Sequence, residues 1–173
     1  SFEDIKSRYD SVIVAIGAWK SMGLSCDGAD LEGVYGGIDF LEAVALNNPP
    51  SLGKSVAIVG GGNTAMDACR TAVRLGAQNV YVIYRRTRAE MPAEDIEIEE
   101  AMEEGVEFKF LTNPHIILGE NGHVTGLKLQ VMELGEPDES GRRSPVAVEG
   151  KFETLAVDSV ISALGQRINA DGF

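Results

Sequence analysis

A run of three glycines between two regular segments constrains the fold of this chain more than any other feature. Gly60, Gly61 and Gly62 follow the apolar segment 55–59 and precede a helical pattern over 63–75, and residues 80–84 are again apolar and β-branched. Strand, glycine turn, helix and strand in this order are typical of a βαβ unit, whose strands are parallel and whose crossover is right-handed. The sequence therefore predicts an α/β chain with a Rossmann-like, three-layer fold.

A second pattern is a short string that occurs twice. Residues 10–17 and 158–165 share the skeleton Asp-Ser-Val-Ile-x-Ala-x-Gly, and in each copy an apolar run with β-branched residues ends in glycine. Such runs are typical of strands that are buried on both faces. We expect two equivalent strands in two related folding units, and therefore a segment of a larger, two-domain protein.

The remaining elements follow from periodicity and from turn residues. The predicted central parallel sheet is accompanied by an antiparallel β-meander with turns near residues 120–122 and 138–143. The predictions are a connector over 18–37, helices over 39–46 and from 92 or 93 to 104, and meander strands over 106–111, 124–132 and 152–156.

The glycine turn fits the pattern GxGxxG/A, which in this context predicts a phosphate-binding turn. Gly60 permits the sharp turn, Gly62 lets the backbone approach a pyrophosphate, and Ala65 lets helix and strand pack closely. The helix that begins near Asn63 points free N–H groups and its positive dipole end at the phosphates. The alternative to phosphate binding is a purely structural turn. The alternative role for Asn63 and Thr64 is that of helix caps.

The end of the second strand indicates which dinucleotide binds. NAD sites usually carry an acidic residue about 20 residues after the glycines, whereas NADP sites place arginine near the 2′-phosphate. Arg85, Arg86 and Arg88 occupy this place, and no acidic residue lies between Tyr84 and Glu90. A guanidinium can bind a phosphate through two hydrogen bonds, so we expect NADPH (NADP+). The alternative is a solvated basic patch.

Composition excludes several classes of function. The chain has 27 acidic and 15 basic residues, a net charge of −12, which argues against nucleic-acid binding. No apolar run approaches the roughly 20 residues of a membrane span, and no signal peptide is recognised. Cys26, Cys69, His115 and His123 have no metal-ligand spacing. We therefore expect a cytoplasmic protein with no metal site of its own, and we expect Trp19 to anchor local packing.

The segment 90–107 is rich in acidic residues. It contains nine of the 27 acids, while Ile98 and Met102 give the predicted helix an apolar stripe. The acids are expected to form the solvated side of that helix. The alternative is a docking surface for a basic partner.

Taken together, the motifs resemble one family. Ala-Ile-Gly-Ala-Trp at 15–19, Val-Gly-Gly-Gly-Asn-Thr-Ala-Met-Asp at 59–67, Tyr-Arg-Arg at 84–86 with Met-Pro-Ala at 91–93, and Ala-Leu-Gly-Gln at 163–166 resemble the small subunit of glutamate synthase. Sister NAD(P)H:FAD oxidoreductases of the pyridine nucleotide-disulphide oxidoreductase superfamily carry the same motifs. The resemblance spans nearly the whole chain.

The resemblance implies an FAD domain that is interrupted by an NAD(P)H domain. Residues 1–36 would be the end of an FAD-domain segment and a connector, 37–156 the NAD(P)H-binding domain, and 157–173 the return strand. Gly60, Gly62 and Ala65 would hold the pyrophosphate, Arg85 and Arg86 the 2′-phosphate with Arg88 as a third member, and Gly165 and Gln166 would lie near the junction of flavin and nicotinamide.

The implied activity is that of the longer enzyme, an oxidoreductase that passes hydride from NADPH to FAD for onward electron transfer. The family's iron–sulfur cysteine clusters and its FAD-binding glycine motif are missing from this chain, so we expect it to bind nicotinamide dinucleotide, not to retain FAD and to be inactive alone. Expected partners are the FAD domain of the same polypeptide and a large glutamate synthase subunit or another electron acceptor. Open alternatives are a reductase of the same plan that uses NADH or another acceptor, and a non-catalytic module for redox sensing or docking.

Overall fold

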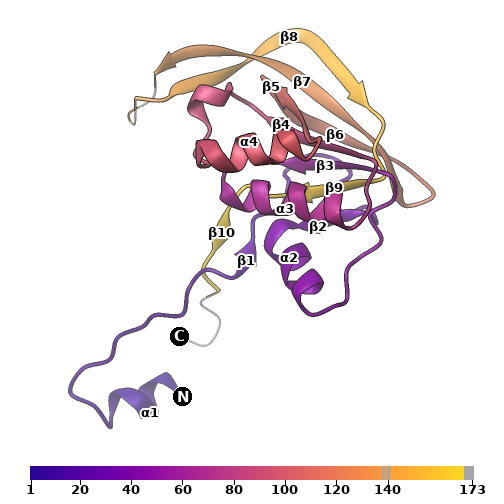
Figure 1. Ribbon diagram of the computed structural model, residues 1–173. Coiled ribbons are helices and arrows are strands. Elements are labelled where there is room, and N and C mark those ends of the chain that lie inside the picture. Colours follow the sequence, from indigo (N-terminus) through magenta and orange to yellow (C-terminus); the bar gives the residue numbers. More distant parts are fainter. Residues whose placement is uncertain (138, 140, 170–173) are drawn as a thin grey trace.

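The computed structural model describes residues 1–137, 139 and 141–169. Within these residues the elements follow one another from an isolated N-terminal helix to a short C-terminal strand (Figure 1). They are α1 (Phe2–Lys6), β1 (Lys20–Ser21), β2 (Val34–Gly36), α2 (Gly37–Ala45), β3 (Ser55–Val59), α3 (Asn63–Arg74), β4 (Asn79–Tyr84), the 3-10 turn η1 (Arg88–Glu90), α4 (Asp95–Glu103), β5 (Glu107–Phe110), β6 (Thr112–Glu120), β7 (His123–Pro137), β8 (Arg143–Leu155), β9 (Ser159–Ser162) and β10 (Gln166–Arg167).

A parallel sheet forms the centre of the molecule. In the described part of the chain its five strands have the order β2-β9-β3-β4-β5, and every neighbouring pair is parallel. The predicted βαβ unit is present as β3, α3 and β4, with Val56 opposite Val80 and Val59 opposite Ile83. This architecture confirms the predicted fold class.

The sheet is covered on both faces, as its apolar strands require. Side chains alternate along β3: Val56 and Ile58 belong to a core with α2, α3 and α4, whereas Ala57 and Val59 belong to a core under the strands β6, β7 and β8. Figure 1 shows the helices on one side of the sheet and the long strands arching over the other. The result is three layers with a core on each side of the sheet.

The third layer is the antiparallel meander β6-β7-β8. It packs Ile117, Leu127 and Leu129 against the central sheet, and each is nearly or fully inaccessible to solvent. The meander was predicted, but β6 was not, and Val106–Leu111 was wrongly assigned to it. β5 instead pairs parallel with β4, because α4 returns the chain to the edge of the central sheet.

The prediction of a buried strand over 11–17 is wrong. These residues form no strand, and the side chain of Ile13 is 92% exposed. The reason is the lack of a neighbouring strand to take up their backbone hydrogen bonds within the described residues. The second copy of the string does form β9, whose four residues are all buried between β2 and β3.

Residues 1–19 extend away from the sheet, and α1 lies at their far end (Figure 1). The expectation that Trp19 anchors local packing is wrong, because its side chain is 73% exposed. Its indole N–H donates to the carbonyl oxygen of Ile16 at 2.9 Å. The predicted connector 18–37 contains two strands that sequence reasoning missed, β1 and β2. β1 pairs antiparallel with β10, next to the sheet.

The sheet draws strands from outside the predicted domain 37–156, since β2 and β9 lie in the flanking segments. The boundaries at 36/37 and 156/157 stay predictions. None of the helices in the described ranges is long and apolar enough to cross a membrane.

Candidate functional site

A cavity of about 900 Å³ opens at the carboxyl ends of β3, β4 and β9. The chain proceeds from β3 to β4 and β5 on one side, while β9 and β2 lie on the other, so the cavity lies where the strand order reverses. Open α/β sheets bind ligands at this switch point. Of the predicted site residues, six line the cavity: Gly60, Gly62, Thr64, Arg85, Arg86 and Gly165.

The three glycines of the turn have different surroundings. Gly60 has φ +148°, and a Cβ atom on it would overlap the carbonyl oxygen of Ala163. A Cβ on Gly61 would overlap the ring of Tyr84. Gly62 is different: its φ is −98°, and the nearest atom to a Cβ would be Cγ of Pro92 at 3.8 Å. Gly60 and Gly61 are therefore required by packing, whereas Gly62 leaves its backbone open to the cavity.

The N-terminus of α3 faces the same space. Gly62 is the N-cap residue and no described side chain caps the helix, so the alternative that Asn63 or Thr64 caps it is wrong. The Asn63 side chain instead accepts a hydrogen bond from the Glu94 amide at 3.1 Å, and Ala65 is fully buried beneath the turn. An uncapped helix N-terminus with a glycine turn can bind an anion through main-chain amides.

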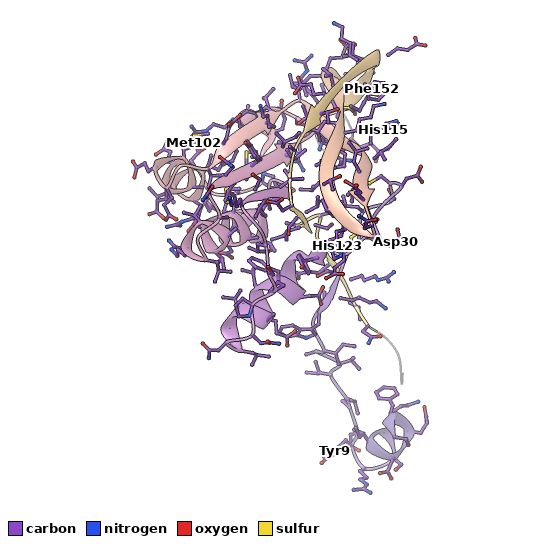
Figure 2. All side chains as sticks on the ribbon, turned by 90° about the vertical axis from the view of Figure 1, so that its right-hand side faces the viewer. Tyr9, Asp30, Met102, His115, His123 and Phe152 are labelled. Atoms are coloured by element: carbon purple, nitrogen blue, oxygen red, sulfur yellow. The ribbon has the colours of Figure 1, made fainter. Side chains whose placement is uncertain are left out.

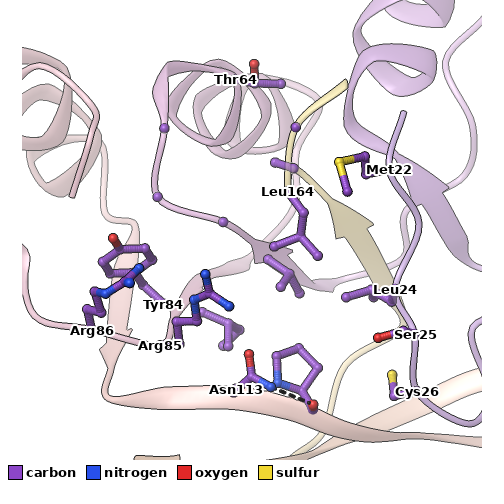
Figure 3. A pocket seen from close by; sticks show the side chains of 18 of the residues that line it. Met22, Leu24, Ser25, Cys26, Thr64, Tyr84, Arg85, Arg86, Asn113 and Leu164 are labelled. Atoms are coloured by element: carbon purple, nitrogen blue, oxygen red, sulfur yellow. Dashed lines mark hydrogen bonds between the residues drawn. The ribbon is translucent and has the colours of Figure 1, made fainter. Parts of the chain in front are cut away.

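The predicted arginines lie in three different environments. Arg85 is exposed and projects into the cavity beside Arg86 (Figure 3). Arg86 is only 7% exposed, and its Nε donates to the carbonyl oxygen of Arg143 at 2.7 Å. Arg88 does not line the cavity, and its guanidinium lies 3.0 Å from a carboxylate oxygen of Glu99 and 3.6 Å from one of Asp95.

Sequence reasoning missed Arg142 as a cavity residue. Its Nη2 donates to the Tyr84 hydroxyl at 3.1 Å and to the Glu90 carbonyl at 2.7 Å. Tyr84, whose ring packs on Gly61, also donates its hydroxyl proton to that carbonyl, at 2.7 Å. Arg142 lies 58 residues from Tyr84 in the chain, so no local pattern could have connected the two.

The other end of the cavity is more apolar. Met22, Leu24 and Leu164 line it beside Cys26 and Gly165, as the close view shows (Figure 3). The Met22 amide donates to the Gly165 carbonyl at 3.0 Å, and burial raises the pKa of the Cys26 thiol. Gln166 lies outside the lining, in β10, where it pairs with Ser21. The cavity therefore has a cationic end and an apolar end, with the glycine turn between them.

Of the two histidines, His115 lines the cavity and His123 does not. His115 lies against Phe152 on the meander, with ring centroids 4.8 Å apart, and His123 lies farther along the meander, 3.5 Å from a carboxylate oxygen of Glu32 (Figure 2). No group of three potential metal ligands occurs among residues 1–137, 139 and 141–169.

Comparison with known proteins supports this architecture. The sequence profile described as "pyridine nucleotide-disulphide oxidoreductase" matches residues 3–173. The chain is 45% identical over 169 residues to the NADP(+)-dependent formate dehydrogenase subunit beta of Moorella thermoacetica. It is 45% identical over 170 residues to the NADPH-Fe(3+) oxidoreductase subunit beta of Geobacter sulfurreducens, and 40% identical over 177 residues to the glutamate synthase [NADPH] small chain of Escherichia coli.

These alignments include 95–96% of the chain but only 24%, 25% and 38% of the respective relatives, so the chain spans well under half of their length. Among solved structures, FprA from Mycobacterium tuberculosis in complex with NADPH superposes with a TM-score of 0.84 at 21% identity, over 99% of this chain and 53% of that one. Thioredoxin reductase from Giardia duodenalis gives a TM-score of 0.60 at 23% identity, over 84% and 41% of the two chains. The structural matches establish the fold.

Proposed function

Because the chain belongs to the pyridine nucleotide-disulphide oxidoreductase family, we propose that it is the NADPH-binding domain of a flavin-dependent oxidoreductase. One observation carries the proposal. A single cavity brings together an uncapped helix N-terminus, a glycine that leaves room for a ligand, and arginines at the end of β4.

The residues present fit a dinucleotide phosphate. Gly62 leaves space where a side chain would otherwise stand, and the amides at the start of α3 would hold the pyrophosphate. Arg85 would bind the 2′-phosphate, and Arg86 would position the end of β4 through its bond to Arg143. The apolar end beside Leu164 and Gly165 would take the nicotinamide. A bound nicotinamide supplies the hydride; this chain binds and orients it.

The preference for the phosphorylated cofactor depends on charge. NAD sites place a carboxylate at the end of the second strand, where it accepts from the ribose 2′-hydroxyl. Here that place is taken by Arg85, and the nearby Glu90 carboxylate accepts from the amide and hydroxyl of Thr87. A guanidinium attracts the 2′-phosphate that a carboxylate would repel.

The activity of the longer protein is part of the proposal. Relatives named as a formate dehydrogenase subunit, an iron(III) oxidoreductase subunit and a glutamate synthase small chain support electron transfer from NADPH to an acceptor. We propose that FAD is held by another domain of the same polypeptide and that a larger subunit accepts the electrons. The unpaired cysteines Cys26 and Cys69 fit a reducing, cytoplasmic location.

Calorimetric titration with NADPH and with NADH tests the proposal. The wild-type chain should prefer NADPH, and Arg85→Ala should weaken NADPH by about 2–3 kcal/mol while it spares NADH. Arg88→Ala removes the same charge from a residue that is paired with Glu99 outside the cavity, so it serves as the matched control. Equal affinity for the two nucleotides would indicate the NADH-using alternative, and binding of neither would favour a docking module.

A further inference from the structure

The β7–β8 hairpin carries Arg142 to the cationic end of the cavity. β7 and β8 continue past the central sheet, and their far ends lie on the side of α4 (Figure 1). Three hydrogen bonds attach this end of the hairpin to the last residue of β4 and to the segment that follows it: Arg86 to the Arg143 carbonyl, and Arg142 to both the Tyr84 hydroxyl and the Glu90 carbonyl. The position of the Arg142 guanidinium is therefore tied to the end of β4.

A second cavity of about 410 Å³ adjoins this region, between η1 and the hairpin. Pro92 and Arg142 line both this cavity and the large one. Arg142 therefore stands where the large cavity passes from the glycine turn toward η1. A dinucleotide with its pyrophosphate on α3 and its nicotinamide beside Leu164 would direct its adenosine end to this junction.

From this placement we propose that Arg142 is a specificity-determining residue for the 2′-phosphate, in addition to Arg85. This inference rests on the proposed function. Arginine is charged at every physiological pH, and its planar group can hold the Tyr84 hydroxyl and the Glu90 carbonyl while it still presents positive charge to an anion. Specificity would then combine a charge from β4 with a charge from a hairpin that is remote in sequence.

Arg143 offers a matched control one residue away. Its side chain donates to the carbonyl oxygens of Gly135 at 3.1 Å and Leu134 at 2.8 Å, within the hairpin, and it lines the second cavity but not the large one. Arg143→Gln thus removes the same charge from the same end of the hairpin and loosens the hairpin, without removing a guanidinium from the large cavity. Arg142→Lys keeps the charge but loses the planar fork.

The experiment is calorimetric titration of the whole chain and its variants with NADPH and with NADH. Arg142→Gln should weaken NADPH by about tenfold and NADH by less than about twofold, Arg142→Lys should recover part of the loss, and Arg143→Gln should keep the wild-type ratio of the two affinities. An unchanged ratio in both Arg142 variants, or an equal loss for both nucleotides, would show a merely structural residue and overturn the inference while the proposed function stands. Failure of the wild-type chain to bind either nucleotide would overturn both.

Discussion

At the scale of single residues, the glycine turn separates packing from ligand binding. Gly60→Ala places a methyl group against the Ala163 carbonyl in a backbone conformation with φ +148°, so we expect the unfolding free energy to fall by roughly 1–3 kcal/mol. Gly62→Ala has an allowed conformation and free space, and it should change that free energy by no more than about 0.5 kcal/mol. Urea unfolding measures both effects.

Although Gly62→Ala should hardly change the unfolding free energy, it should change the affinity for the nucleotide. Gly62→Ala should weaken NADPH by an order of magnitude or more, about 1.4 kcal/mol, because its methyl group points where the pyrophosphate would approach. If Gly62→Ala binds NADPH as the wild type does, the amides of this turn do not contact the ligand.

Glu90 gives a prediction about pH. Hydrogen bonds from the Thr87 hydroxyl and amide hold the pKa of its carboxyl below the usual value. Because the folded pKa lies below the unfolded one, this interaction stabilises the fold above the unfolded pKa, near 4.3, and is lost as the pH falls through the folded value. Glu90→Gln should therefore have a lower urea midpoint than the wild type at pH 7, and the gap should narrow below about pH 4.

Glu120→Gln is the control for this measurement, since Glu120 is exposed at the β6–β7 turn. It should follow the wild-type midpoint across the whole pH range. A constant gap between Glu90→Gln and the wild type from pH 7 to pH 3 would disprove the role of the Glu90 charge.

At the scale of elements, the acidic helix is held by ion pairs rather than simply solvated. Arg70 of α3 is 17% exposed and lies 2.6–3.0 Å from carboxylate oxygens of Glu97, Glu100 and Glu104. The prediction that these acids form the solvated side of α4 thus missed that several of them face α3. An amphipathic pattern shows which side of a helix is polar, but not which neighbour supplies the opposite charge.

Arg70→Met should therefore destabilise the contact between α3 and α4. Glu97, Glu100 and Glu104 would lose their shared cation, and Arg74 would still pair with Glu104 alone. The urea midpoint should therefore fall at pH 7 and recover in part at high salt, which screens the repulsion between the carboxylates. Arg74→Met removes an exposed pair with Glu104 and should cost at most about 1 kcal/mol. If Arg70→Met and Arg74→Met lowered the urea midpoint by the same small amount, the ion pairs of Arg70 would not hold α3 and α4 together.

The sequence predicted most accurately the helices and strands that pack or pair with elements close to them in the chain. β3, α3 and β4 form one βαβ unit, and each was predicted within a residue or two of its observed bounds. The copies of the Asp-Ser-Val-Ile string show the limit, because one is the buried strand β9 and the other is exposed around Ile13. The same local sequence adopts two states because a strand needs hydrogen-bonding neighbours, and neighbours are a property of the fold.

The candidate site shows the same division. Sequence motifs identified the glycine turn and Arg85, both of which belong to the βαβ unit. They could not identify Arg142, which a hairpin brings from 58 residues away, or reveal that Arg88 is paired with acids of α4. β6 was missed because Pro114 and an irregular register interrupt its alternation, yet residues 113–116 form one wall of the cavity.

At the scale of the whole molecule, the two cores share one sheet, so we expect the meander to unfold together with the sheet in one cooperative transition. Leu127 on β7 is fully buried against the central sheet. Leu127→Ala should lower the unfolding free energy by about 2–5 kcal/mol and keep a single transition. Leu46→Ala, at a position that is 71% exposed, should change it by less than about 0.5 kcal/mol. Two separate transitions in the Leu127 variant would mean that the meander folds independently.

The central claim concerns where a dinucleotide lies, and a crystal structure of the chain with NADP+ tests it most directly. We expect the pyrophosphate on the amides of Gly62 and the first turn of α3, and the 2′-phosphate within hydrogen-bonding distance of the Arg85 guanidinium. Nucleotide density elsewhere, or density in the cavity with the 2′-phosphate turned away from Arg85 into solvent, would contradict the account.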